Sequence, residues 1–196
     1  MSPAGAGPPA ASTRRVFLAL PLPQAARQEV AAHCAPLAAQ GAALRSVAPA
    51  GYHVTVHFFG GLAHGDLARA RELCLDDSLA PVAPLRCRFS ALGQLPPRGP
   101  ARVVHAVIGE GAAALKDFMV RIRARVGTAG FAVDRRPPLP HVTVARVRRG
   151  MKWTARSPVT WAGVAFLLDR LVLFESHLGR AGARYEPLVT RRLGLS

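Results

Sequence analysis

The tetrapeptide His-Val-Thr-Val occurs twice in this chain, at residues 53–56 and again at residues 141–144. With seven His and seven Thr among 196 residues, random placement would give about 0.25 His-x-Thr triplets. Each copy ends a unit of similar length, because Val16 to His53 spans 37 residues and Val103 to His141 spans 38. The near-equal spacing indicates a duplicated structural unit.

Both units have the residue pattern of a strand, a helix and a second strand. The predicted strands cover residues 15–20, 53–59, 102–108 and 141–147, and the predicted helices cover residues 24–40 and 111–126. Outside the units we expect a helix over 67–76 with Asp66 as its N-cap, and strands over 86–92, 161–167, 170–175 and 184–190.

This mixture of strands and helices predicts an α+β protein. We expect two pseudo-symmetric lobes around a central cleft, each lobe an antiparallel sheet with helices on its outer face. Residues 1–13 are mostly Pro, Ala, Gly and Ser without periodicity, which predicts a flexible tail. Residues 14–196 are then a single bilobal domain.

Strand geometry places the His and Thr of each motif together, because side chains alternate between the two faces of a strand. His53 and Thr55 share one face, and so do His141 and Thr143, while the valines of each motif can pack on the core. The same alternation places His57 beside His53 and Thr55. If the lobes face each other, two imidazoles and two hydroxyls meet in one cleft.

Such a set of groups suits phosphodiester cleavage without a metal. One histidine can take a proton from the attacking water while the other protonates the leaving oxygen. Threonine hydroxyls can donate hydrogen bonds to phosphate oxygens as negative charge builds on them. His33, His64, His105 and His177 have no motif context, and no ligand spacing predicts a metal site or a cofactor.

With these motifs, the chain resembles the 2H phosphoesterases, and within them the RNA 2′,3′-cyclic phosphodiesterases, also called 2′-5′ RNA ligases. The matching segments are Arg15–Pro21, HVTVHFFG at 53–60, PHVTVAR at 140–146, and the pair Leu173–Ser176 and Tyr185–Leu188. In place of the tryptophan that often precedes the first motif, this chain has residues 45–52 without Trp, and His57 stands where many members have Lys.

The resemblance implies metal-independent hydrolysis of an RNA terminal 2′,3′-cyclic phosphate to a 2′-phosphate, and in some members joining of 2′-5′ linked RNA. It implies His53 as proton donor and His141 as proton acceptor, an order that the sequence alone leaves open. Two alternatives stay open at this point. One is a related esterase for a small cyclic nucleotide, and the other is a non-catalytic RNA-binding module.

The chain carries a formal charge of +15, and 24 of its 26 basic residues are arginines. High positive charge favours RNA or phosphate partners, although a GC-rich genome would also enrich Arg together with Ala, Gly and Pro. Seven basic residues lie between Arg135 and Arg156, and no acid occurs between Asp134 and Asp169. This stretch is a candidate phosphate-backbone track or a solvated loop.

Four further residues are candidates for substrate binding. Arg146 follows the second motif; alternation puts it on the valine face, but it lies at the strand end, and the resemblance implies a phosphate contact. Phe17 and Tyr52 could stack a base, with core packing as the alternative for Phe17. His57 is a candidate through its position beside His53.

Three cysteines without C-x-x-C spacing argue against a disulfide framework and a zinc knuckle. We therefore expect a reducing, cytoplasmic setting. The N-terminal residues lack an apolar signal region, and no apolar run approaches the ~18 residues of a membrane helix. The expected partners are RNA ends or cyclic nucleotides, with no membrane association and a monomeric protein.

Overall fold

The fold was analysed in a computed structural model, which describes residues 13–38, 42–76, 83–153, 159–179 and 182–194. The predicted tail therefore lies almost wholly outside the described residues, as does Arg156. The helices are α1 (Gln24–Ala38), α2 (His64–Leu75) and α3 (Ala112–Thr128), with a short 3-10 turn at Pro49–Gly51. No helix among the described residues has the length and apolar character that a membrane span requires.

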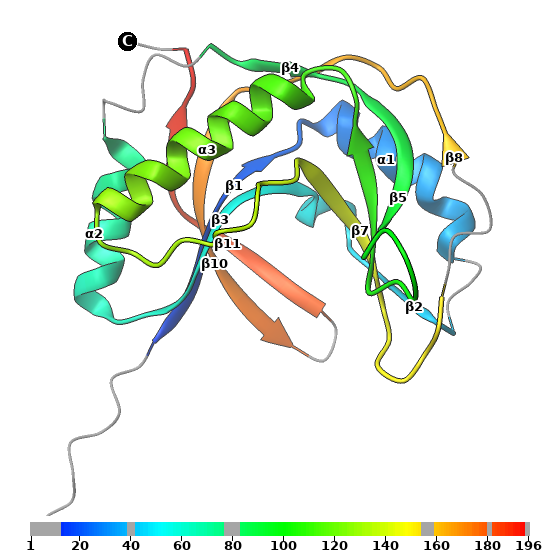
Figure 1. The fold of residues 1–196 in the computed structure, drawn as a ribbon, viewed down its shortest axis with the longest axis horizontal. Coiled ribbons are helices and arrows are strands. Elements are labelled where there is room, and N and C mark those ends of the chain that lie inside the picture. Colours follow the sequence, from blue (N-terminus) through cyan, green and yellow to red (C-terminus); the bar gives the residue numbers. More distant parts are fainter. Residues whose placement is uncertain (1–12, 39–41, 77–82, 154–158, 180–181, 195–196) are drawn as a thin grey trace, which may run out of the picture.

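The strands form a curled antiparallel sheet in the order β11-β10-β1-β3-β7-β6-β5-β8, with β2 added to β7, and a separate β4–β9 pair (Figure 1). Their bounds are β1 Arg14–Pro21, β2 Leu44–Ser46, β3 His53–Leu62, β4 Leu85–Cys87, β5 Phe89–Leu95, β6 Val103–Ile108, β7 His141–Val147, β8 Val159–Thr160, β9 Phe166–Leu168, β10 Arg170–Gly179 and β11 Gly182–Arg192. The predicted α+β class is confirmed.

The two repeated units lie on either side of the β3–β7 junction. In each unit the two predicted strands pair antiparallel, β1 with β3 and β6 with β7. Strands β3 and β7 meet through a single residue pair, Val54 with Val142, because β2 takes the pairing positions along the rest of β7. The sheet therefore opens into two arms from the point where the two motifs meet.

Each unit's helix packs on the arm of the sheet that contains the other unit's strand pair. Helix α1 contacts β2, and its Glu29 carboxylate accepts hydrogen bonds from Trp161 Nε1 at 3.1 Å and the Val164 amide at 3.0 Å. Helix α3 contacts β3, and Arg123 Nε donates to the Val56 carbonyl at 3.2 Å. These helix contacts hold the two arms together on the face of the sheet opposite the motif histidines.

The apolar periodicity of the sequence predicts the core of α3. The residues of its expected stripe are all buried: Leu115, Phe118, Met119, Ile122 and Val126. The four motif valines are buried as well, Val54, Val56, Val142 and Val144. Burying each such side chain contributes about 1.5–3 kcal/mol, so these positions fix which sheet face meets the helices.

Three local predictions were wrong. Helix α2 begins earlier than expected, with Ala63 as N-cap, and Asp66 lies in its first turn, where it accepts a hydrogen bond from Arg69. The strand over 86–92 is split at Arg88 into β4 and β5, which pair with different strands. The strand over 161–167 is absent between Trp161 and Ala165, and only β9 covers its end.

Candidate active site

The Val54–Val142 pair brings the two His-Val-Thr-Val motifs side by side. Because both valines point into the core, His53 and Thr55 on β3 and His141 and Thr143 on β7 stand on the opposite face. All four are half-buried, as expected for groups at the floor of a cleft. The expected meeting of both motifs in one region of the fold is thus present.

The last valine of each motif is a β-bulge residue. In the β1–β3 pairing, Leu18 faces His57 and Ala19 faces Thr55, which leaves Val56 without a partner. In the β6–β7 pairing, Val104 faces Ala145 and His105 faces Thr143, which leaves Val144 without one. A bulge inserts one residue and reverses the alternation beyond it, so both strands change faces at the same motif position.

The two bulges decide the places of His57 and Arg146. His57 is turned into the core at 4% exposure, and its Nε2 has no hydrogen-bond partner among the described residues. The prediction that His57 lies beside His53 in the site is therefore wrong. Arg146 is turned back to the motif face and lines the cavity with His53 and Thr55. Phe58 is its counterpart in the first unit and lines the same cavity.

Both motif histidines have the same hydrogen-bonded orientation. His53 Nδ1 lies 2.7 Å from the Gly51 carbonyl, and His141 Nδ1 lies 2.8 Å from the Leu139 carbonyl. Because a carbonyl only accepts, Nδ1 must carry the proton in each ring. Nε2 of each neutral imidazole then has its lone pair available, and that of His53 lies 3.1 Å from the Thr55 hydroxyl.

The electrostatic environment favours neutral imidazoles in the free protein. Burial lowers the pKa of His53 to about 4, against the opposing effect of the Gly51 carbonyl, and the nearby His141 and Arg146 lower it further. Burial also lowers the pKa of His141, and Arg146 acts in the same direction. A bound phosphate anion would offset these positive charges and favour a protonated histidine.

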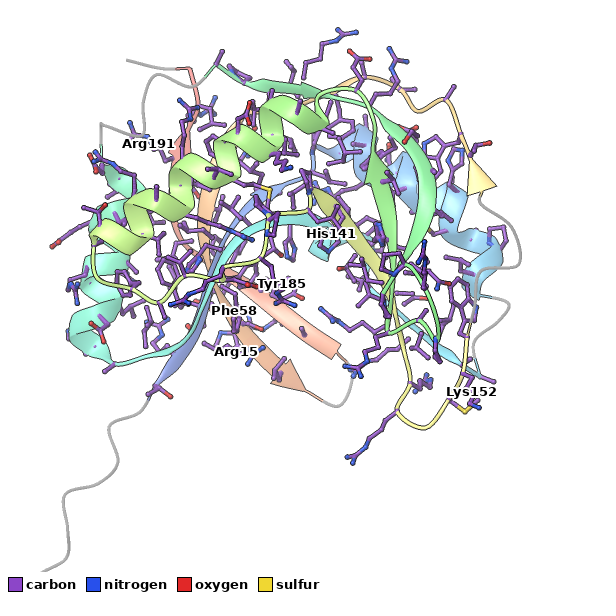
Figure 2. All side chains as sticks on the ribbon, in the orientation of Figure 1. Arg15, Phe58, His141, Lys152, Tyr185 and Arg191 are labelled. Carbon is purple, nitrogen blue, oxygen red and sulfur yellow. The ribbon has the colours of Figure 1, made fainter. Side chains whose placement is uncertain are left out.

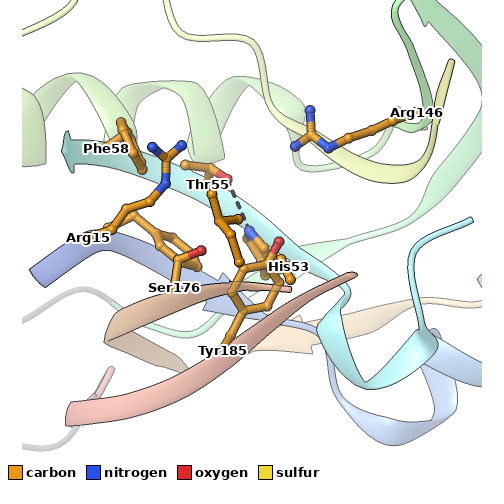
Figure 3. A pocket seen from close by; sticks show the side chains of 10 residues that line it. Arg15, His53, Thr55, Phe58, Arg146, Ser176 and Tyr185 are labelled. Atoms are coloured by element: carbon orange, nitrogen blue, oxygen red, sulfur yellow. Dashed lines mark hydrogen bonds between the residues drawn. The ribbon is translucent and has the colours of Figure 1, made fainter. Parts of the chain in front are cut away.

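A cavity of about 380 Å³ lies over the first motif (Figure 3). Its wall on one side is the β10–β11 hairpin, which contributes Ser176 and Tyr185, and Arg146 reaches it from β7. This volume lies in the range of pockets that bury one small ligand. His141 and Thr143 lie outside the lining of this cavity, on the adjoining strand (Figure 2 labels His141).

The two aromatic candidates from the sequence do not offer a face to a base. Tyr52 is buried at 4% exposure, and burial raises the pKa of its hydroxyl to about 12. Phe17 lines the cavity but is 3% exposed. Its ring contacts both the His53 ring, 5.0 Å away, and the Phe174 ring, 5.5 Å away, and these two rings are 6.4 Å apart, centroid to centroid. Phe17 therefore packs against the His53 ring, and Tyr52 belongs to the core.

Six residues that line the cavity had no role in the sequence analysis, and three of them, Tyr185, Phe58 and Arg15, carry aromatic or charged side chains. Tyr185 is half-buried and stands edge-on to His53, with ring centroids 5.1 Å apart. Phe58 is exposed, and the Arg15 guanidinium lies 4.4 Å from the centre of its ring. The sequence signal for Tyr185 was its position in the C-terminal segment 185–188. This segment is part of the family resemblance, but the resemblance gave the Tyr185 side chain no role.

His105 is a further histidine beside the motifs. It pairs with Thr143 across β6 and β7, and its ring lies 5.3 Å from the His141 ring. The side chain is 7% exposed and lies over Gly93, where an added Cβ would come within 2.8 Å of Nε2. Burial and the nearby His141 lower its pKa to about 4. Sequence spacing gave no signal for it, because β6 carries no motif.

Within the part of the chain that the structure describes, no three His, Cys, Asp or Glu side chains cluster as a metal site would require. The three cysteines are free and buried, at positions 34, 74 and 87.

Comparison with known proteins supports a relationship through both sequence and fold. "RNA 2′,3′-cyclic phosphodiesterase" of Bacillus subtilis strain 168 is 29% identical over 152 residues, which are 72% of this chain and 76% of that protein. The protein of the same name from Geobacillus stearothermophilus is 26% identical over 180 residues, or 88% of this chain. The aligned region spans only about half of the Geobacillus protein, 55% of its length.

Two solved structures share the fold. The protein TT0787 of Thermus thermophilus superposes with a TM-score of 0.78 at 24% identity, covering 92% of this chain and 98% of its own. Escherichia coli LigT superposes with a TM-score of 0.76 at 22% identity, covering 94% and 99%. The sequence model of the 2′-5′ RNA ligase superfamily matches residues 23–180, a range that includes both His-Val-Thr-Val motifs. This chain belongs to the 2′-5′ RNA ligase superfamily.

Proposed function

We propose that this protein is an enzyme that hydrolyses the terminal 2′,3′-cyclic phosphate of RNA to a 2′-phosphomonoester, without a metal ion. The observation that carries the proposal is the matched orientation of His53 and His141, each fixed through Nδ1 to a carbonyl two residues earlier. With Nδ1 engaged, Nε2 is the atom of each ring that exchanges a proton with substrate. Two such atoms beside two threonines supply an acid, a base and hydroxyl donors.

In the proposed reaction, His141 Nε2 takes a proton from water as the water oxygen attacks phosphorus. The bond from phosphorus to the 3′-oxygen breaks, and protonated His53 gives its Nε2 proton to that oxygen. Thr55, Thr143 and Arg146 bind the non-bridging oxygens, where charge builds in the transition state. The product keeps its phosphate on the 2′-oxygen, and proton exchange with solvent restores both histidines.

The same arrangement gives 2′-5′ ligation when an RNA 5′-hydroxyl takes the place of water, because attack at phosphorus again expels the 3′-oxygen. The names of the Bacillus and Geobacillus relatives support the cyclic phosphate as substrate. Escherichia coli LigT has been crystallised with 3′-AMP and with phosphate, which supports a nucleotide phosphate as the bound group.

A second candidate is hydrolysis of a small cyclic nucleotide. The observation that favours it is the 380 Å³ cavity, which has room for about one nucleotide.

The decisive experiment uses purified protein with RNA ending in a 2′,3′-cyclic phosphate, with and without EDTA. We expect equal rates in both conditions and a 2′-phosphate at the product end, identified by enzymatic digestion of the RNA and chromatography of the terminal nucleotide against 2′- and 3′-phosphate standards. Loss of activity with EDTA would contradict metal independence. A 3′-phosphate product would contradict the assignment of the leaving oxygen.

A further inference from the structure

A second groove, of about 1020 Å³, lies at the ends of β5, β6 and β7. Its floor includes the apolar side chains of Pro96, Val103 and Met151, and the guanidinium groups of Arg102, Arg148 and Arg149 surround it. All three arginines are exposed. An apolar floor with a cationic rim fits a ligand that carries both flat apolar rings and negative charge.

The groove lies next to the candidate active site along β7. Arg146 lines the 380 Å³ cavity and is the Cα partner of Val103, which lines the groove. Arg148 follows two residues later along the same chain, a distance of about 7 Å in an extended strand. One ligand can therefore contact Arg146 in the cavity and Arg148 in the groove.

The positive charge of this rim is not neutralised by acidic neighbours. Elsewhere many arginines form ion pairs, for example Arg88 with Glu110 at 2.9 Å and Arg170 with Asp169 at 2.8 Å. Among the described residues, no carboxylate pairs with Arg102, Arg148 or Arg149. Only Arg136 on this groove is paired, to Asp134 at 2.6 Å. The cluster therefore raises the local concentration of anions.

The backbone holds the rim in place. The Arg102 amide donates to the Leu95 carbonyl at 2.7 Å, and the Val147 amide donates to the Arg102 carbonyl at 2.9 Å. A tight turn closes the far end, where the Met151 amide donates to the Arg148 carbonyl at 3.0 Å and Gly150 takes a φ of 81°. The rim residues are thus presented from fixed backbone, which lowers the entropic cost of binding.

We propose that this groove binds the single-stranded RNA chain on the 5′ side of the terminal nucleotide, an inference that rests on the proposed function. The terminal nucleotide occupies the 380 Å³ cavity, and the chain leaves it past Arg146. Backbone phosphates of the preceding nucleotides lie on Arg102, Arg148 and Arg149, and a base packs on Met151 and Pro96. The preferred substrate is therefore an oligonucleotide end and not a free cyclic mononucleotide.

The test compares a cyclic mononucleotide with RNA of two, three and five nucleotides, all ending in a 2′,3′-cyclic phosphate. We expect kcat/KM to rise with length until the groove is filled. Each neutralised phosphate contributes a slope of about −0.7 in log affinity against log salt on single strands. With two such contacts, raising the salt from 50 to 200 mM should weaken the affinity for the trimer about sevenfold more than the affinity for the mononucleotide.

The variant Arg148→Ser/Arg149→Ser should lose both the gain with length and the added salt dependence, while its rate on the mononucleotide stays unchanged. Arg71→Ser/Arg121→Ser is the matched control, because it removes the same charge from exposed positions on α2 and α3 that are not part of the groove lining. A rate that is independent of length, or equal losses in both double variants, would overturn the proposal.

Failure of the proposed function is distinguishable, since then no cyclic phosphate would be hydrolysed at any length. In that case the groove is tested by fluorescence anisotropy with an RNA pentamer ending in a 2′-phosphate. Weaker binding by Arg148→Ser/Arg149→Ser than by the control variant supports the groove. Equal binding by the two variants, or equally tight binding of polyglutamate by the wild type, overturns it.

Discussion

The Nε2 atom of His53 lies 3.1 Å from the Oγ1 atom of Thr55, two residues along the same face of β3. Because His53 Nδ1 is held by the Gly51 carbonyl, this contact is a hydroxyl donating to the free nitrogen of a neutral ring. The Thr55 hydroxyl thus has two roles in the proposed reaction. It stabilises neutral His53 before substrate binds, and it turns to a phosphate oxygen afterwards.

The first prediction separates these roles. Thr55→Val and Thr143→Val keep the β-branched shape and remove only the hydroxyl. Each should lower kcat by roughly 10–10³, the cost of one oxyanion donor. Only Thr55→Val should also raise the pKa of the His53 imidazole, because it removes a hydrogen bond to the neutral form. Steady-state kinetics and NMR titration of the imidazoles measure both effects, and unchanged kcat in both variants would contradict the role of the hydroxyls.

The second prediction concerns the two histidines as a unit. His53→Ala and His141→Ala should each abolish most activity while circular dichroism and thermal unfolding stay close to wild type. If the two groups act in one transition state, the double variant should be little worse than either single variant. Near wild-type turnover in either single variant would contradict the acid–base roles of the two histidines.

The third prediction follows from the lowered pKa of His53, about 4, and the lowered pKa of His141. The reaction needs one charged and one neutral imidazole. The pH profile of kcat/KM reports the free enzyme, and its decline on the basic side should lie below about pH 6.5, the ordinary pKa of histidine. In the complex, the phosphate anion favours the imidazolium. The basic limb of kcat should therefore lie at higher pH.

Both limbs of this profile report the coupled pair and not one residue. The measurement is a set of Michaelis curves between pH 4 and 9 in buffers of constant ionic strength. A kcat/KM profile that is flat across this range would point to another catalyst.

The fourth prediction concerns stability and His57. Burial lowers the pKa of His57 to about 4, Arg123 adds to this effect, and Asp134 opposes it. A folded-state pKa below the unfolded value means that stability is fully present above about pH 6.5 and is lost as pH falls toward 4. The full pKa difference between the folded and unfolded states corresponds to about 3 kcal/mol in the free energy of unfolding for one such histidine. Urea unfolding at several pH values should show this decline.

His57→Leu removes the titrating group at a buried position and should reduce the decline with pH, while activity stays near wild type because His57 lies outside the cavity. His64→Leu is the control, since His64 lies at the start of α2, away from the cavity. An equal dependence on pH in wild type and His57→Leu would show that His57 does not contribute.

The fifth prediction assigns base stacking to Tyr185. Replacing it with Leu should raise KM by about 5- to 150-fold, in line with 1–3 kcal/mol for a stacked base. Tyr185→Phe keeps the ring and should restore most of the affinity. Tyr52→Phe is the matched control, because Tyr52 is buried away from the cavity. Equal KM values for Tyr185→Leu and wild type would show that the base does not stack on Tyr185.

The sequence by itself determined most of the strands and helices and the core positions of the motif valines. The strand over 141–147 has the predicted bounds, and the apolar stripe of α3 is the buried one. The valines of both motifs lie in the core. These features follow from the periods of 2 and 3.6 residues, which are properties of a single segment and can be read from its residues.

Only the tertiary structure decided which side chains join the motifs. The bulges at Val56 and Val144 are register shifts between two strands, and no pattern within one strand reveals them. They turn His57 into the core and Arg146 toward the cavity, against simple alternation. Tyr185 reaches His53 from more than 130 positions along the chain. Such contacts depend on which strands pair, and pairing is settled by burial over the whole sheet and not by local sequence.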